Sequence, residues 1–147
     1  MEKIVIGKKF DTKYDFRETC FGIYEKDGKI LLCKKDNQYS LIGGGIEVGE
    51  SREECLRREF LEESGYNILS IKEMVVIDCF WLAAGQYPLE SLVNIFVIEV
   101  DEQTHQKPLE ENIEIEFVDI DKVEDLLPLP YHKKAIECYK ITNKKTP

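Results

Sequence analysis

The fold is decided by one continuous stretch, in which residues 43–50 read GGGIEVGE and residues 51–66 read SREECLRREFLEESGY. Ser51 and Glu54 match a capping box, in which two side chains satisfy the free amides at a helix N-terminus. Gly65 lies where the end of a helix favours a residue in the left-handed conformation. The stretch therefore predicts a glycine-rich loop followed by a helix over residues 51–64.

The end of this predicted helix carries Glu59, Glu62 and Glu63, which share one face because their spacing is i, i+3 and i+4. Glu59 and Glu63 repel each other, and all three oppose the helix dipole. A bound divalent cation would remove both penalties, and a hard ion such as Mg²⁺ prefers carboxylate oxygens. The pattern predicts a Mg²⁺ site, with Mn²⁺ as the alternative ion; the other interpretation is a solvated acidic face.

Arg58 stands four residues after Glu54 and four before Glu62, a spacing that allows ion pairs along the helix. An arginine among carboxylates also orients them and keeps them ionised. We expect both roles for Arg58.

The three consecutive glycines free the backbone for conformations that other residues cannot hold. Main-chain groups can then approach a ligand closely, and the expected substrate-binding residues are Gly43, Gly44 and Gly45. A flexible turn is the simpler interpretation. The region matches neither GxGxxG nor the P-loop, so those phosphate-binding motifs are excluded.

A family resemblance joins these features. The fixed positions are, in order, Gly44, then after five residues Glu50, then after seven residues Arg58-Glu59-Phe60, then Glu62-Glu63 and Gly65-Tyr66. This pattern resembles the Nudix box, Gx5Ex7REUxEExGU with U a bulky apolar residue, at every fixed position. The resemblance covers only residues 44–66. Relatives often have proline before the paired glycines, where this chain has Ile42.

The resemblance implies an α/β fold, a Nudix-type α/β/α sandwich with a mixed β-sheet, and we expect residues 1–147 to form this single domain. It implies metal ligands at Glu59, Glu62, Glu63 and the carbonyl of Gly43. It also implies that the catalytic residues include Glu50, which ligates metal or partners Arg58, together with Arg58, Glu62 and Glu63.

An acidic residue outside the box completes the site in many relatives, on the loop before a late strand. Glu110, Glu111 and Glu114 lie in that region. Glu111 and Glu114 are the candidates, and Glu111 is the expected catalytic residue. Glu114 also fits the solvent face of an alternating strand.

The identity of the substrate is only weakly encoded. Phe80, Trp81 and Tyr87 could stack on a base, because aromatic faces suit bases. Core packing is the better interpretation for Phe80, and for Trp81 core packing and substrate binding remain equal alternatives. The residues that mark dinucleoside-polyphosphate and ADP-ribose subgroups do not stand at their fixed spacing, and coenzyme A and NADH signatures are absent. A nucleoside triphosphate, standard or oxidised, remains by elimination.

Composition restricts the possible partners. The net charge of -9 argues against binding a nucleic-acid polymer or an anionic membrane surface. Five scattered cysteines, without zinc spacing, predict free and mostly buried thiols in a reducing compartment. The N-terminal residues are too charged for a secretion signal. These features predict a cytoplasmic protein, and an exposed strand edge would allow a homodimer.

The rest of the chain predicts strands and two further helices. Asp27-Gly28 between the apolar runs 20–24 and 30–34 predicts a hairpin. Further strands are expected over residues 39–42, 71–82, 92–100 and 113–118, and helices over 123–127 and 131–141. This order suggests a mixed sheet with helices on both faces.

The predicted function is Mg²⁺-dependent hydrolysis of the diphosphate bond in a nucleoside diphosphate linked to another moiety, such as a nucleoside triphosphate that yields a monophosphate. One alternative is a Nudix-fold sensor that binds a nucleotide or sugar phosphate without cutting it. A second is a diphosphate isomerase, which would need a catalytic cysteine such as Cys20, Cys33 or Cys79. The third is an acidic protein without catalysis.

Overall fold

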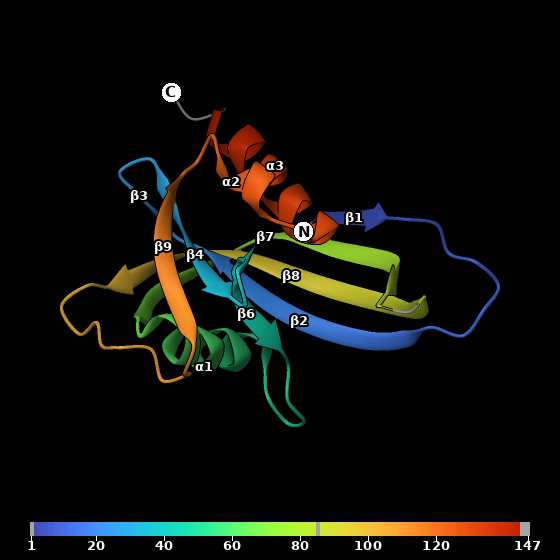
Figure 1. Ribbon diagram of the computed structural model, residues 1–147, viewed down its shortest axis with the longest axis horizontal. Helices are drawn as coiled ribbons and strands as arrows, with labels where there is room; N and C mark the ends of the chain where they lie inside the picture. Colours follow the sequence, from blue (N-terminus) through green and yellow to red (C-terminus); the bar gives the residue numbers. More distant parts are fainter. Residues whose placement is uncertain (1, 85, 145–147) are drawn as a thin grey trace.

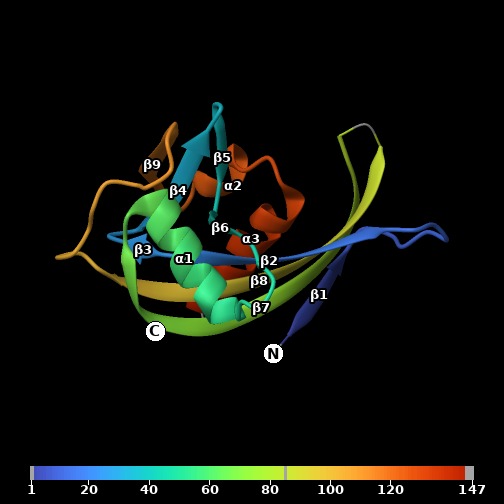
Figure 2. The same cartoon turned by 90° about the horizontal axis from the view of Figure 1, so that it is seen from below.

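The chain folds into a layered α/β structure, seen in a computed structural model that describes residues 2–84 and 86–144. A long mixed sheet forms the middle layer. Helix α1 (Arg52–Ser64) covers one face, and helices α2 (Val123–Leu126) and α3 (Pro130–Lys144) cover the other (Figures 1 and 2). The predicted α/β/α sandwich with a mixed sheet is therefore confirmed.

The middle layer is a five-stranded sheet with both parallel and antiparallel pairs. In spatial order its strands are β1 (Lys3–Ile6), β7 (Asn67–Ala83), β8 (Tyr87–Asp101), β2 (Asp15–Ile23) and β6 (Ile42–Gly45). β7 and β8 are longer than the predicted ranges 71–82 and 92–100, because the two strands pair with each other beyond their apolar centres, from Asn67 opposite Asp101 to Ala83 opposite Tyr87. β1 was not predicted, since four residues carry too little periodicity.

A second, smaller sheet contains β3 (Glu25–Lys26), β4 (Lys29–Lys35), β5 (Gln38–Ser40) and β9 (Ile113–Asp119). The predicted Asp27-Gly28 turn is present, and both residues have positive φ, 53° and 77°, as a type I′ turn requires. It closes only the short β3–β4 ladder. The expected hairpin between runs 20–24 and 30–34 forms only next to the turn, where Glu25 pairs with Ile30 and the Leu31 amide donates to the Tyr24 carbonyl at 3.0 Å. Farther from the turn the runs separate, because β2 pairs with β8 and β6 while β4 pairs with β9.

Each face of the five-stranded sheet buries its own apolar cluster. Alternation along β2 sends Cys20 to the cluster under α1 and Phe21 to the cluster under α3. Phe60 of α1 packs directly over Gly22, where an added Cβ would come within 2.8 Å of its ring. The sheet therefore lies between the two apolar clusters, and the alternation of side chains along its strands determines which residues enter each cluster.

Helix α1 begins and ends as the sequence predicted. Ser51 accepts from the amide of Glu54, and the Glu54 carboxylate accepts from the amide of Ser51, so the capping box is complete. Gly65 has φ 76° and donates its amide to the carbonyl of Leu61. The helix is fixed at both ends, and its carboxylate-bearing face is held in place.

The remaining predictions on cysteines and helices also agree with the structure. All five cysteines are free, and four are buried: Cys20, Cys33, Cys55 and Cys79. The predicted C-terminal helices correspond to α2 and α3, with α3 extended at both ends. Across the described residues, no helix combines the length and apolarity needed to cross a membrane.

Candidate active site

The glycines form β6, which lies at the edge of the five-stranded sheet beside β2. A side chain at Gly43 would come within 2.0 Å of the Cys20 carbonyl, so only glycine allows this close pairing. At Gly44 an added Cβ would lie 2.5 Å from Oε1 of Glu59. The absence of side chains thus lets the carboxylate of α1 reach the backbone of β6.

Arg58 connects the helix, the glycine strand and the loop between them. Its Nε and Nη2 donate to the two oxygens of Glu50 at 2.7 and 2.9 Å, a bidentate pair. Its Nη1 donates to Glu59 at 2.9 Å and to Glu62 at 3.3 Å, and Nη2 also reaches the carbonyl of Gly45 at 3.1 Å. Hydrogen bonding from Arg58 lowers the pKa of Glu50 to about 2, so Glu50 is ionised at neutral pH.

One of the two expected helix pairs of Arg58 is absent. Glu54 uses its carboxylate to cap the helix at Ser51 instead. Arg58 turns toward Glu50 and Glu62, which leaves its guanidinium over the acidic face of α1. The predicted orienting role therefore has a structural basis.

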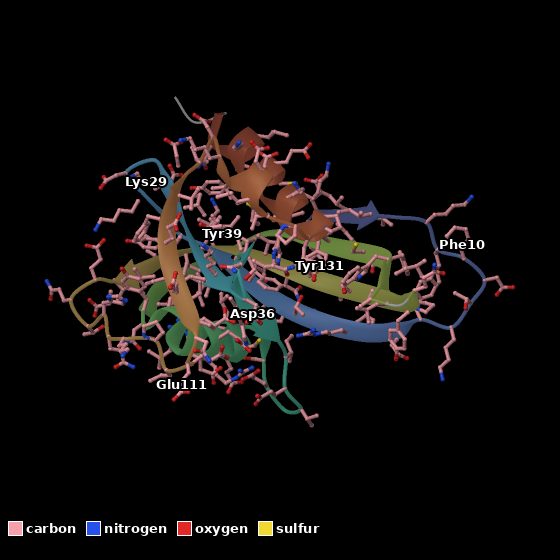
Figure 3. All side chains as sticks on the ribbon, in the orientation of Figure 1. Phe10, Lys29, Asp36, Tyr39, Glu111 and Tyr131 are labelled. Atoms are coloured by element: carbon pink, nitrogen blue, oxygen red, sulfur yellow. The ribbon has the colours of Figure 1, made fainter. Side chains whose placement is uncertain are left out.

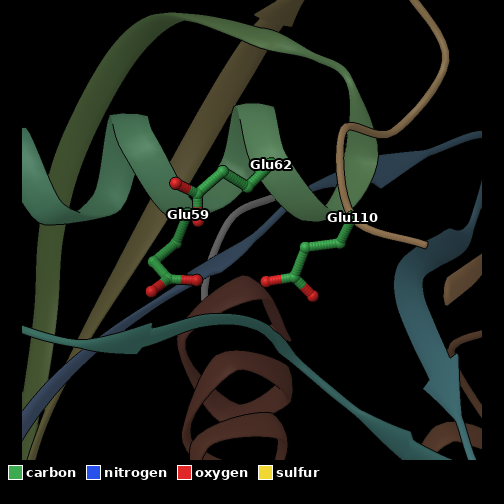
Figure 4. A group of neighbouring side chains, drawn as sticks. All are labelled: Glu59, Glu62 and Glu110. Atoms are coloured by element: carbon green, nitrogen blue, oxygen red, sulfur yellow. The ribbon is translucent and has the colours of Figure 1, made fainter. Parts of the chain in front are cut away.

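Three carboxylates meet beside β6. Glu59, Glu62 and Glu110 each offer an oxygen within 4.8 Å of the other two, and Figure 4 shows their side chains turned toward one another. We call these three residues the carboxylate cluster. Burial, opposed by Arg58, raises the pKa of Glu59 above its usual value, and the charge of Glu62 raises it further. Such crowding of negative oxygens is the donor set that a hard divalent cation favours.

Glu63 lies next to the cluster and faces a different partner. Its Oε1 accepts from the amide of Gly43 at 3.0 Å, and the Cys33 thiol lies 3.9 Å from the same oxygen. Burial raises the pKa of Glu63 to about 8, and the charges of Glu59 and Glu110 add to this rise. The structure thus ties Glu63 to the glycine strand, whereas its expected role as a metal ligand stays a prediction.

The acidic residue that joins the helix from outside the box is Glu110. Its amide and that of Leu109 donate to the carbonyl of Glu62 at 3.0 and 2.9 Å, and Gln106 donates to the carbonyl of Gly65 at 3.0 Å. His105 contacts the carbonyl of Ser64 at 2.9 Å. These bonds satisfy carbonyls that every helix leaves free at its C-terminus, and they bring Glu110 over α1.

The expected candidates Glu111 and Glu114 lie outside the cluster. Both are exposed, and Figure 3 shows Glu111 at the outer side of the molecule, near the start of β9. Glu114 stands on the solvent-facing side of β9, as the alternating pattern allowed. Main-chain bonds to α1 bring Glu110, and not Glu111, to the cluster, whereas the expected catalytic role of Glu111 stays a prediction. No signal in the sequence distinguishes the two neighbouring glutamates.

Trp81 lies on the opposite face of the sheet from α1. Its ring packs edge-on against Tyr131 of α3, with centroids 6.0 Å apart, and its Nε1 donates to Ser91 at 3.0 Å. Phe80 packs against Tyr14, and Tyr87 is exposed. Core packing therefore accounts for much of the Trp81 environment, and its role in substrate binding stays a prediction.

A sandwich that presents a carboxylate-bearing helix to a glycine edge strand is the arrangement found in the Nudix class. The chain belongs to the Nudix family, because the NUDIX domain matches residues 17–140. Nudix hydrolases generally use divalent metals, which fits the donor set of the carboxylate cluster.

Two kinds of relatives resemble the chain. Over 54 residues it is 44% identical to nucleoside triphosphatase NudI of Escherichia coli O1:K1; the match covers 32% of this chain and only 38% of that protein. The MutT protein of Bacillus halodurans aligns with a TM-score of 0.69 at 20% identity, covering 82% of this chain and 80% of that one. A MutT NUDIX hydrolase of Burkholderia pseudomallei aligns with 0.67 at 22%, covering 84% and 97%. These structures share the fold.

Proposed function

We propose that this chain hydrolyses the diphosphate bond of a nucleoside diphosphate derivative. Its substrate would be a nucleoside triphosphate, and the products would be a nucleoside monophosphate and inorganic diphosphate. The carboxylate cluster beside the glycine strand is the observation that carries the proposal. Family membership supports a hydrolase, and the partial similarity to a nucleoside triphosphatase supports the substrate class.

The donor chemistry fits Mg²⁺, or Mn²⁺, held by Glu59, Glu62 and Glu110, with Glu63 and the Gly43 carbonyl as further candidates. When bound, such an ion supplies positive charge that polarises the phosphorus–oxygen bonds. The glycine backbone lets the Glu59 carboxylate lie directly against β6, so that the proposed ion would be held beside this strand.

The chain's own groups would position water and receive its proton. A water oxygen attacks phosphorus, the bridging phosphorus–oxygen bond breaks, and the leaving phosphate keeps the electron pair. The proton passes to a carboxylate, for which Glu62 and Glu110 are the candidates that face the cluster. Arg58 fixes Glu50, Glu59 and Glu62 relative to one another, so its role is positioning.

The isomerase alternative is disfavoured by the state of the thiols. Cys20, Cys33 and Cys79 are buried, and burial raises the pKa of Cys33 to about 12 and that of Cys79 to about 11. A thiol with such a pKa is protonated at neutral pH and is a poor acid–base or nucleophilic group.

Substitutions in the cluster test the proposal. We expect Glu62→Gln and Glu110→Gln each to lower kcat by at least about 100-fold without unfolding the chain, because a neutral amide neither binds the cation nor accepts a proton. The measurement is release of monophosphate from nucleoside triphosphates, nucleotide sugars, ADP-ribose and dinucleoside polyphosphates with Mg²⁺ or Mn²⁺.

Glu53→Gln is the matched control, since Glu53 is exposed on the same helix and, among the described residues, pairs with Arg57 alone. Glu111→Gln decides between the two neighbouring glutamates. Near-native turnover by Glu110→Gln, together with loss in Glu111→Gln, would restore Glu111 as the functional residue. A native chain that binds nucleotides but releases no product would favour the sensor alternative.

A further inference from the structure

Arg17 differs from the other three arginines of the chain in having no carboxylate partner. Arg52 pairs with Glu18 at 2.9 Å, Arg57 pairs with Glu53 at 3.0 Å, and Arg58 pairs with the acidic face of α1. Within the described part of the chain, Arg17 makes no ion pair or side-chain hydrogen bond. In a protein of net charge -9, a guanidinium without a carboxylate partner stands out, because it remains available to bind an anion.

The guanidinium of Arg17 lies against the glycine strand. An ideal Cβ on Gly45 would be 3.4 Å from both Nε and Nη2 of Arg17. On the preceding residue, Gly44, the corresponding position meets the carboxylate of Glu59. Successive residues of a strand point to opposite faces, so the two charges lie on opposite sides of β6, within roughly 10 Å of each other.

The surroundings of Arg17 contain a second unpartnered group. Thr19 lies on the same face of β2 and directly opposite Gly45, and its buried hydroxyl has no partner in the described chain. The Thr19 oxygen is enclosed, so of these two groups only the exposed Arg17 side chain is accessible to a ligand. Burial raises the pKa of Tyr131 on α3, which is labelled in Figure 3, and the charge of Arg17 opposes this rise.

We propose that Arg17 binds a phosphoryl oxygen of the substrate on the side of β6 opposite the carboxylate cluster. The proposal rests on the proposed function and makes it narrower: the substrate is a nucleoside 5′-polyphosphate whose phosphate chain crosses the outer edge of β6. One part of that chain meets the cation held by the carboxylates, and another part meets Arg17. The edge position of β6 is what leaves this path free of a neighbouring strand.

The distribution of charges supports the proposal that the cation and Arg17 bind different parts of the phosphate chain. On the carboxylate side, Arg58 is bound to Glu50, Glu59 and Glu62, and Lys35 lies 3.8 Å from Glu110, so both cationic side chains are already paired there and a phosphate depends on the bound cation. On the other side, Arg17 can offer two parallel N–H donors to a phosphate, a geometry that guanidinium groups favour. Trp81, which is only half-buried, lies on the same face of the sheet, where it packs against the buried Tyr131.

Binding of a non-hydrolysable analogue tests the proposal without relying on turnover. The probes are the α,β-imido analogues of the four standard nucleoside triphosphates with Mg²⁺, followed by calorimetry and by the fluorescence of Trp81, the single tryptophan. We expect Arg17→Gln to weaken binding about 10- to 100-fold, as loss of a charge-assisted hydrogen bond implies. Arg17→Lys should recover part of the affinity, because it keeps the charge but not the paired donors.

Arg57→Gln is the matched control and should bind like the native chain, since Arg57 lies on α1 and contacts Glu53 and the Ile68 carbonyl. In hydrolysis assays, Arg17→Gln should raise KM about tenfold or more and leave kcat within about twofold, the pattern of lost substrate binding. Unchanged affinity and KM would overturn the proposal, as would a fall in kcat at unchanged affinity or a native chain that binds none of the analogues.

The result separates this inference from the proposed function. Binding that depends on Arg17, in a native chain that releases no product from the whole substrate panel, would support the inference and reject hydrolysis. Hydrolysis with identical kinetic constants in native and Arg17→Gln proteins would support the proposed function and reject the role of Arg17.

Discussion

Arg58 shows how one side chain organises several charges at the residue scale. It holds Glu50 by two hydrogen bonds and reaches Glu59 and Glu62 with the remaining nitrogen. The ion pair keeps the pKa of Glu50 at about 2, so Glu50 remains an acceptor for Arg58 through the neutral range. Residues coupled in this way act as a unit and not as independent contributors.

This coupling is testable by a double-mutant cycle. We expect Arg58→Lys and Glu50→Gln each to lower kcat/KM about tenfold or more, because each loses the bidentate pair that orients the cluster. The double variant should be little worse than either single variant, since both remove the same interaction. Steady-state kinetics of the four proteins provide the measurement, and losses that simply multiply would contradict a shared role.

Local patterns explain why the sequence predicts that Glu59 and Glu62 share one face of a helix but does not predict that Glu110 lies beside them. The capping box, the helix and the spacing of Glu59 and Glu62 depend on residues close in sequence, which periodicity records. Glu110 is selected by main-chain bonds between a distant loop and the end of α1. The chemistry of acidic neighbours at 110 and 111 is the same, so only tertiary structure separates them.

At the scale of elements, the contact between α1 and the following loop depends on a glycine. Gly65 has φ 76°, and a Cβ there would lie 1.8 Å from the carbonyl oxygen of Gln106. The same residue ends the helix and admits the loop that carries Glu110. Gly65 therefore contributes both to the stability of the fold and to the assembly of the carboxylate cluster.

Gly65→Ala should therefore lose both stability and activity. Left-handed strain costs about 1–2 kcal/mol for a residue with a Cβ, and the clash with Gln106 adds to it by displacing the loop. Gly28→Ala is the matched control, since Gly28 has φ 77° but nothing within 4 Å of its added Cβ. Urea unfolding and turnover should show strain alone at Gly28, whereas equal losses at both positions would show that the loop contact is unimportant.

At the scale of elements, the sequence does not predict which strands pair with each other. The turn at Asp27-Gly28 is predicted from two residues and joins β3 to β4, yet β2, which precedes β3, belongs to the other sheet. The partners of β2 and β4, which are β8 and β9, lie far along the chain, so nothing local to the turn specifies them. The four-residue β1 likewise forms only because β7 is available as a parallel partner.

At the scale of the whole molecule, one buried titratable group makes stability depend on pH. His132 of α3 is fully buried, packs edge-on against Phe21 at 4.4 Å, and neither ring nitrogen has a partner among the described residues. Burial lowers its pKa to about 3, whereas the unfolded chain protonates it near 6.5. Between these values the unfolded chain binds the extra proton.

The stability due to neutral His132 is thus present above about pH 6.5 and is lost as pH falls toward 3, with a slope of up to about 1.4 kcal/mol per pH unit. His132→Phe should remove this slope, since phenylalanine fills the aromatic site without titrating. Urea unfolding of both proteins at several pH values between 4 and 8, to be compared as differences, isolates His132 from the carboxylates. Parallel curves for the two proteins would rule it out.

Some predictions about the whole molecule are confirmed, and others remain predictions. The sandwich fold and family are confirmed, because the box is specific and the fold follows the family. A single domain over residues 1–147, a cytoplasmic location and a homodimer remain predictions. The location depends on the cell and the homodimer on a second chain, neither of which the fold of one chain encodes.

The docking of the loop on the end of α1 has a consequence for how this protein would lose its function. Glu62 contributes its carboxylate to the cluster and its carbonyl to the loop amides, so the same few bonds close the helix and assemble the charges. Fraying of one helical turn would scatter those charges while the long strands stayed paired. Inactivation would then precede melting, as a local event at a single corner of an otherwise intact scaffold.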